Sequence, residues 1–310
     1  MNGNRNTLTL AGAMLLVAGF AGTAFASSNG SSTDPYASLP SSLELTGVVR
    51  DFRERSVSGG HPDFERQPSS GFAHYFNLVQ DDLDSEGKPQ FRSTGNKMSS
   101  QWRDAAGRNR IPNRSYIASR PGDVNGAHAT TAGGAVVSSD SLRQWYRDVP
   151  GVNVSRQLSL NLVRTPGTNI YTFNDRTDPT YSNRGGFFPI NGELLGNSGG
   201  GGVANTNYHF TFELETEFMY RQGQGQVFTF TGDDDVFVFI DGKLVIDIGG
   251  VHSAISQSID LDRLTWLQDG RNYKLKFFFA ERHRTQSNFR IDTTIQLRTV
   301  DPPVTTALYD

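Results

Sequence analysis

The chain has 310 residues and a formal net charge of −3, from 29 Lys and Arg against 32 Asp and Glu. This balance leaves no basic excess, so a nucleic-acid partner is not expected. The 21 Phe residues supply material for a hydrophobic core, and the lack of cysteine excludes disulfides, thiol chemistry, Cys-ligated zinc and iron–sulfur clusters.

The N-terminus has the pattern of a secretory signal. Arg5 precedes an uncharged apolar run over residues 8–22, and an Ala-Phe-Ala sequence ending at Ala26 fits the small-residue cleavage rule. We therefore expect residues 1–26 to be removed and the chain to be secreted, into the extracellular space or onto the cell surface. A retained membrane anchor is the alternative. No later stretch is long and apolar enough to span a bilayer, and residues 27–43 read as a flexible lead-in.

The next elements are one strand, long loops and one short helix. A first strand is expected over 43–52, and the polar residues 87–137 read as loops. The helix is predicted over 141–149, because its apolar side chains recur at i, i+3, i+4 and i+7. Asp140 is its candidate N-cap, and Pro150 ends it.

The remaining elements read as strands. Apolar and polar residues alternate over 158–162, 208–214, 273–279 and 289–297, which predicts one buried and one exposed face, as in an antiparallel sandwich. Residues 236–240 are apolar on both faces and should form a central strand, followed by a hairpin turn at Asp241-Gly242. The sequence therefore predicts an all-β antiparallel fold with long loops and one short helix.

Three consecutive carboxylates, Asp233, Asp234 and Asp235, stand at the entrance to that central strand. Like charges repel, and Asp is a poor strand former. A hard cation explains the cluster, since Ca2+ takes about six to eight oxygen ligands. A cis peptide would let two neighbours reach one ion, at a cost of about 3–4 kcal/mol. A solvated, turn-forming Asp cluster is the alternative.

A second polar loop could complete such a site. The segment 281–288 joins two of the clearest strands and offers oxygen donors from Glu281, Gln286, Ser287 and Asn288. An ordinary polar hairpin loop, with His283 as an exposed loop residue, is the alternative.

Two long segments, 232–252 and 277–295, resemble the fibro-slime domain, a branch of the PA14 superfamily. Shorter stretches upstream extend the resemblance: LTGVVRDF, HPDFE, WYRDVPGVN, FFPINGELLG and NYHFTFELETEF. The resemblance spans 44–299, is strongest over 207–299, and leaves 300–310 as a C-terminal tail. It implies a PA14-like β-sandwich or barrel.

The resemblance also implies a ligand set. PA14 lectins hold Ca2+ with two neighbouring Asp joined by a cis peptide and with an Asn from a second loop, and the ion coordinates sugar hydroxyls. The pair falls on Asp233 and Asp234, and the Asn on Asn288. Asp235 replaces the usual Gly, so its role as a further metal ligand, a cap or a residue that narrows the site stays open. The expected ligand-binding residues around the ion are Glu281, His283, Gln286 and Ser287.

The expected function is that of a secreted, calcium-dependent carbohydrate-binding adhesion module for extracellular polysaccharide or surface glycan. The alternative is a structural subunit that self-associates into an extracellular fibre or matrix, with a purely structural calcium. An enzyme is not expected. The G-x-S-x-G match at 196–200 lies in a glycine run, without the flanking strand and helix that a nucleophile elbow needs.

Overall fold

The computed structural model describes residues 34–198, 205–300 and 305–306. These residues belong to one unit, Asp34–Asp310, and the expected signal peptide lies outside the described part. Most of the C-terminal tail and the first part of the lead-in also lie outside it. Within the described part, no helix is long and apolar enough to cross a membrane.

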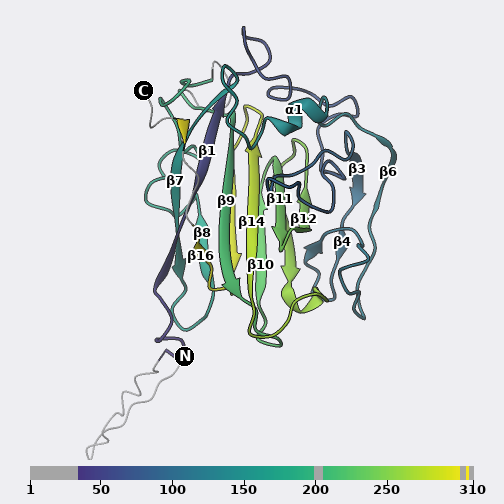
Figure 1. The fold of residues 1–310 in the computed structure, drawn as a ribbon, viewed down its shortest axis with the longest axis vertical. Helices are drawn as coiled ribbons and strands as arrows, with labels where there is room; N and C mark the ends of the chain where they lie inside the picture. The colour runs from purple at the N-terminus through teal and green to yellow at the C-terminus, as the bar shows by residue number, and fades with distance from the viewer. Residues whose placement is uncertain (1–33, 199–204, 301–304, 307–310) are drawn as a thin grey trace, which may run out of the picture. The chain divides into compact units, whose positions relative to one another are not determined.

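The fold is almost entirely β, as predicted (Figure 1). Among the described residues, the α-helix and the strands have the following bounds: β1 Ser42–Phe52, β2 Tyr75–Phe76, β3 Asn96–Ser100, β4 Trp102–Arg103, β5 Asn109–Arg110, β6 Ala127–Ala132, α1 Ser139–Arg143, β7 Asn153–Arg164, β8 Tyr171–Asn174, β9 Phe210–Met219, β10 Val227–Gly232, β11 Asp235–Ile240, β12 Lys243–Ile248, β13 Ile255–Asp260, β14 Asn272–Glu281, β15 Phe289–Thr293 and β16 Arg298–Thr299.

One antiparallel sheet dominates the described part of the chain. Its strand order is β12-β11-β14-β9-β1-β7-β8-β15-β10-β13, with β16 added to β9. The strands at the two ends of this order, β12 and β13, also contact each other, so the sheet curls back and encloses its own core. The predicted strands at 43–52, 158–162, 208–214 and 273–279 are therefore confirmed, and the last expected strand ends early, at Thr293.

The core between the two sides of the curled sheet is rich in phenylalanine. Alternation along β14 sends Phe277 and Phe279 inward, where both rings contact Phe289 of β15 at 5.5 and 5.2 Å between centroids. Phe278 points the other way, into a second apolar cluster that contains Trp145 and Tyr146. Each such large buried side chain contributes about 1.5–3 kcal/mol by burial.

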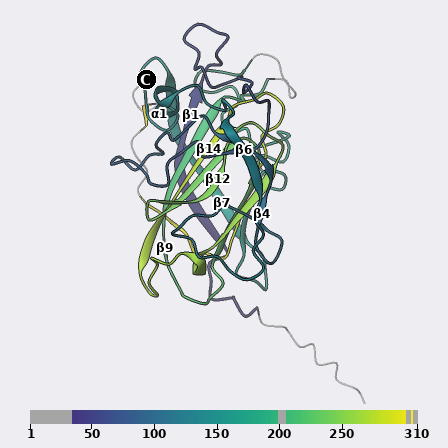
Figure 2. The ribbon, with the colours of Figure 1, turned by 90° about the vertical axis from the view of Figure 1, so that its right-hand side faces the viewer.

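Strand β11 belongs to both clusters, as its doubly apolar sequence predicted. Val236, Val238 and Ile240 pack in the phenylalanine core, whereas Phe237 and Phe239 pack in the second cluster. That second cluster also includes Tyr75 of β2, Leu142 of α1 and Val136 of the segment before α1. The short strands β3, β4 and β6 lie on the side of β11 and β12 (Figures 1 and 2). A central strand with two buried faces is a rigid support for residues at its ends.

The helix differs from its prediction. It spans Ser139–Arg143 and its N-cap is Ser138, not Asp140, because Ser138 and Ser141 form a reciprocal capping box. The chain leaves the helix at Gln144, and the side chain of Asn153 donates to the Gln144 carbonyl. The apolar periodicity continues beyond the helix because Trp145 and Tyr146 are buried in a turn instead.

Candidate functional site

Asp233 and Asp234 lie in the short segment of chain that connects the two sides of the curled sheet. Strand β10 pairs with β13 and β15, whereas β11 pairs with β12 and β14, so the chain crosses the core at Asp233 and Asp234. Asp234 makes the crossing with a left-handed backbone, φ 52°. No described residue has a cis peptide bond, so the geometry of this pair differs from the cis arrangement that we considered.

The second loop lies directly against this pair. The Asp233 carboxylate accepts hydrogen bonds from the backbone N–H and the side-chain amide of Asn288, both at 2.5 Å. The Asp234 carboxylate accepts from the backbone N–H of Arg282 at 2.8 Å. Gly232 permits this approach, because a Cβ at that position would overlap the backbone oxygen of Asn288. The structure therefore brings together the two loops that the sequence singled out.

Glu281 adds a third carboxylate to the pair. It is fully buried at the end of β14, and one oxygen accepts from the His283 N–H at 3.3 Å. The other oxygen makes no hydrogen bond of normal geometry, although the nearby Ser287 hydroxyl lowers the pKa of this carboxyl. Burial, together with the charges of Asp234 and Asp233, raises the pKa of Glu281 well above its usual range. Burial and the Asp233 charge likewise raise the pKa of Asp234, and burial raises that of Asp233 to about 6. We call Asp233, Asp234 and Glu281 the acidic group.

Two further residues lie beside the acidic group without any motif in the sequence that points to them. Asp175, in the loop after β8, is buried and accepts from the backbone N–H of Phe289 at 3.3 Å, and its charge adds to the raised pKa of Asp233. The exposed Arg176 donates to the side-chain oxygen of Asn288 at 2.5 Å. Their segment reads as an ordinary polar turn, and only the pairing of β8 with β15 places it here.

Asp235 lies apart from the acidic group. One oxygen of its carboxylate accepts from the Gly250 N–H at 2.6 Å, and the other accepts from the Arg282 guanidinium at 2.6 Å. Both side chains of this ion pair are fully buried, and the guanidinium lies 4.9 Å from the Trp145 ring centroid. Both oxygens are thus engaged in packing two loops together. Of the roles that the sequence left open for Asp235, this geometry favours a structural one over that of a metal ligand.

The other candidate residues differ in their surroundings. The Ser287 hydroxyl is buried and donates to the Phe187 carbonyl, so it faces the interior and not a ligand. Gln286 is exposed next to Asn288, whose amide reaches the Gln286 side-chain oxygen at 3.4 Å. His283 is partly exposed, hydrogen-bonds Glu65 and contacts the ring of Phe72.

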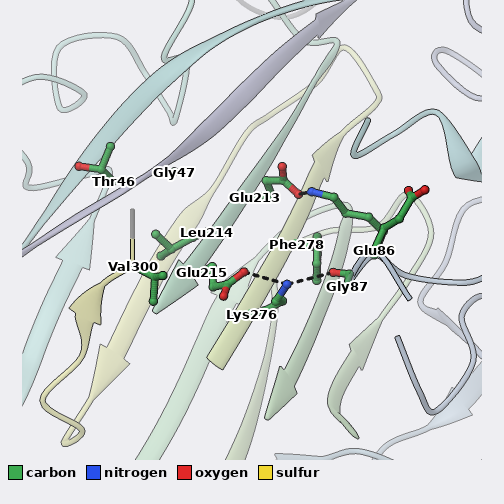
Figure 3. A pocket seen from close by; sticks show the side chains of 11 residues that line it. Thr46, Gly47, Glu86, Gly87, Glu213, Leu214, Glu215, Lys276, Phe278 and Val300 are labelled. Carbon is green, nitrogen blue, oxygen red and sulfur yellow. Dashed lines mark hydrogen bonds and ion pairs between the residues drawn. The ribbon is translucent and has the colours of Figure 1, made fainter. Parts of the chain in front are cut away.

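A separate groove lies over β9 and β14 (Figure 3). Its volume is about 340 Å³, and its floor carries charged side chains of both signs. Lys276 bridges Glu215 at 2.8 Å and the carbonyl of Gly87, and Lys88 pairs with Glu213. These charges neutralise one another, so the groove presents no unpaired ligand set like that of the acidic group.

Residues 168–307 match the model of the PA14 domain family. This match, over 140 of the 310 residues, shows that the segment is similar to the PA14 domain family. The chain's similarity to psiQ of Dictyostelium discoideum is 35% identity over 168 residues, which covers 52% of this chain and 16% of that protein. The chain is also 51% identical to psiK of the same organism over 65 residues, which cover 21% of this chain and 9% of psiK. The chain therefore spans only a small part of the length of these relatives.

A solved structure described as a PA14 sugar-binding domain from an RTX adhesin is 12% identical to this chain. The alignment covers 31% of this chain and 57% of that one, with a TM-score of 0.23. The PA14 match begins at residue 168, so β1 and β7 precede it, although both lie within the same sheet.

Proposed function

We propose that this chain binds Ca2+ at the acidic group and uses the ion to bind carbohydrate outside the cell. The observation that carries the proposal is the gathering of three buried carboxylates, Asp233, Asp234 and Glu281, in one place. Beyond the effect of burial, the charges of Asp234 and Asp233 raise the pKa of Glu281, and the charge of Asp233 raises the pKa of Asp234. Buried charges need pairing or a metal, and carboxylate oxygens are what Ca2+ prefers.

The proposed ligand set differs in two ways from the expected one: it adds Glu281 as a metal ligand, and it omits Asp235. Asp233, Asp234 and Glu281 supply carboxylate oxygens, and Asn288 supplies its amide oxygen. That amide now directs its nitrogen to Asp233 and its oxygen to Arg176. Rotation of the amide by half a turn would direct the oxygen to the ion and release the Arg176 guanidinium. Asp235 is omitted because Arg282 and Gly250 already engage both of its oxygens.

Carbohydrate is the proposed ligand because part of the chain is similar to the PA14 domain family and resembles the lectins of that superfamily. When bound, the ion supplies open coordination positions for sugar hydroxyls. The chain supplies the polar rim: Arg176 and Gln286 are both exposed beside Asn288 and offer donors and an acceptor to a sugar. In this arrangement, Glu281 is a ligand of the ion and not of the sugar, and His283 lies at the edge of the sugar-binding surface.

We propose a binding role in adhesion rather than catalysis at this site, since the acidic group holds no nucleophile. The N-terminal signal pattern supports secretion. A purely structural calcium in a fibre or matrix subunit is the competing function, and the two differ in whether a glycan binds.

Titration calorimetry with CaCl2 tests the metal site. We expect the parent to bind Ca2+ and the Asp233→Asn/Asp234→Asn variant to lose at least about tenfold in affinity, since two charged ligands are removed. Asp292→Asn is the matched control, because Asp292 lies on the neighbouring strand β15 and pairs with Arg290 away from the site. Equal affinities in all three proteins would show that the ion does not bind here.

A glycan array, run in Ca2+ and again in EGTA, tests the ligand. Binding that EGTA reverses, and that the double variant lacks, supports the lectin role. Calcium binding without any glycan binding, together with concentration-dependent filaments, would instead favour the structural subunit.

A further inference from the structure

Three side chains from distant parts of the chain form a hydrogen-bonded series away from the acidic group. The Ser198 hydroxyl lies 2.9 Å from Nδ1 of His209, and Nε2 of the same ring lies 3.0 Å from an oxygen of Glu65. Ser198 and His209 both precede β9 in the chain, whereas Glu65 belongs to the segment between β1 and β2. A hydroxyl, an imidazole and a carboxylate in series are the parts of a serine nucleophile and its base.

The hydrogen-bond partners fix where the protons lie. Nε2 of His209 faces a carboxylate oxygen, so this nitrogen carries a hydrogen and donates it. With a single hydrogen on the ring, Nδ1 then offers its lone pair to Ser198. The backbone N–H of Tyr208 donates to the Ser198 oxygen at 3.1 Å, which leaves the hydroxyl hydrogen to point at Nδ1. This tautomer is the one in which His209 accepts a proton from Ser198.

The surroundings hold the base and the carboxylate in place. His209 is 2% exposed, and its ring meets the Phe64 ring edge-on at 6.0 Å. Glu65 accepts from the Arg284 N–H at 2.7 Å and from His283 at 3.0 Å. Its backbone adopts φ 57°, an unfavourable left-handed conformation for a non-glycine residue that often accompanies function. Glu65 therefore has a fixed position behind the imidazole.

A substrate can reach the hydroxyl. Ser198 and His209 both line an open cavity of about 290 Å³, together with Phe52 and Arg53. At about 30 Å³ per water molecule, this is room for roughly ten waters, or for a small acyl group with part of its alcohol. Arg53 is exposed and makes no side-chain ion pair with the described residues, so its guanidinium is available to an oxyanion in the cavity.

A metal is the other ligand that this cluster suggests. Ligand atoms of Glu54, Glu65 and His209 all lie within 4.8 Å of one another. The Arg284 guanidinium, however, pairs with Glu54 and lies 3.8 Å from Glu65. Because this cation already occupies the space between the two carboxylates and offsets part of their charge, the cluster favours the nucleophile over a metal ion.

We propose that Ser198 and His209 are catalytic residues, positioned by Glu65, that hydrolyse small acyl esters. The Ser198 oxygen attacks the acyl carbon while its proton moves to Nδ1 of His209. The bond to the alcohol oxygen breaks, and that oxygen takes the proton from Nδ1. Water then gives a proton to Nδ1 while its oxygen bonds to the acyl carbon. The bond from that carbon to the Ser198 oxygen breaks, the Ser198 oxygen takes the proton from Nδ1, and the carboxylic acid leaves. This activity departs from our expectation of a non-enzymatic chain, and it is independent of the calcium proposal.

The test is covalent labelling of the full chain with a fluorophosphonate probe, with the labelled peptide located by mass spectrometry. We expect the parent to be labelled at Ser198 and to hydrolyse p-nitrophenyl acetate. Ser198→Ala should lose label and at least about a hundredfold in hydrolysis. Ser58→Ala is the matched control, because Ser58 lines the same cavity without an imidazole partner and should behave like the parent.

The role of Glu65 is tested separately. Glu65→Gln should lower kcat with KM unchanged, because it alters the tautomer of His209 and not substrate binding. If the folded parent is labelled no more than heat-denatured protein, or if Ser198→Ala hydrolyses the ester like the parent, the proposal is wrong. The series would then only hold Ser198 and Glu65 against the start of β9.

Discussion

The buried ion pair between Arg282 and Asp235 should dominate the stability of the region around the acidic group. Both side chains are fully buried. The guanidinium also donates to the carbonyls of Asp63 and Ala135, at 3.1 and 3.2 Å, and packs over Trp145. Arg282→Met would remove all of these contacts and leave the Asp235 carboxylate buried without its cation.

The expected cost is about 3–5 kcal/mol, the range for breaking a buried pair by removing one partner. This is a large share of the roughly 5–15 kcal/mol by which native domains are stable. Asp235→Asn added to Arg282→Met should recover part of the loss, because the Gly250 N–H keeps an acceptor and no charge remains buried. The two changes should therefore be strongly non-additive.

Urea unfolding of the parent, both single variants and the double variant measures this coupling. Backbone groups at Arg282 still bind Asp234 in every variant, so calcium affinity serves as a control for local folding. A cost below about 1 kcal/mol for Arg282→Met, or simple addition of the two single effects, would refute the argument that this pair packs the loops.

Two further predictions concern pH and the approach of the two loops. Burial raises the pKa of Asp247 from 3.8 to about 6, so the folded state holds this proton more tightly than the unfolded chain, and stability falls as pH rises from about 4 to about 6. Asp247→Asn should reduce that fall by about 3 kcal/mol, and an unchanged pH profile of urea unfolding would contradict the assignment. Gly232→Ala would force its Cβ against the Asn288 backbone oxygen and separate the two loops. Calorimetry should show at least about a tenfold loss in calcium affinity, while Gly167→Ala, at a turn with open space, should leave the affinity as it is.

The sequence predicted the fold well where side-chain alternation was strict. Strands β9 and β14 form where the alternation predicted strands, but residues 210–214 and 277–281 are buried on both faces and not on one. Strand β11 is buried on both faces as its sequence requires. The sequence predicted the helix less well. Trp145 and Tyr146 have the apolar spacing of a helix, but they are buried in the turn that follows it.

The candidate site was predictable only in part, for a similar reason. Asp233, Asp234 and Asn288 stand in segments with recognisable motifs, so their loops could be paired in advance. Asp175 and Arg176 could not be found, because their place depends on the long-range pairing of β8 with β15. Likewise, Asp234 and Asp235 point in different directions because Asp234 itself has a left-handed backbone, which no local sequence pattern predicts.

The position of β1 has a consequence for how this protein can be divided. It pairs with β7 on one side and with β9 on the other, and it thereby joins the strands that precede the PA14 match to those within it. A fragment that begins at residue 168 would leave β8 and β9 with unpaired edges on which other chains could stack. The boundary drawn by similarity is thus not a boundary of autonomous folding, and the shortest soluble piece should start before Ser42.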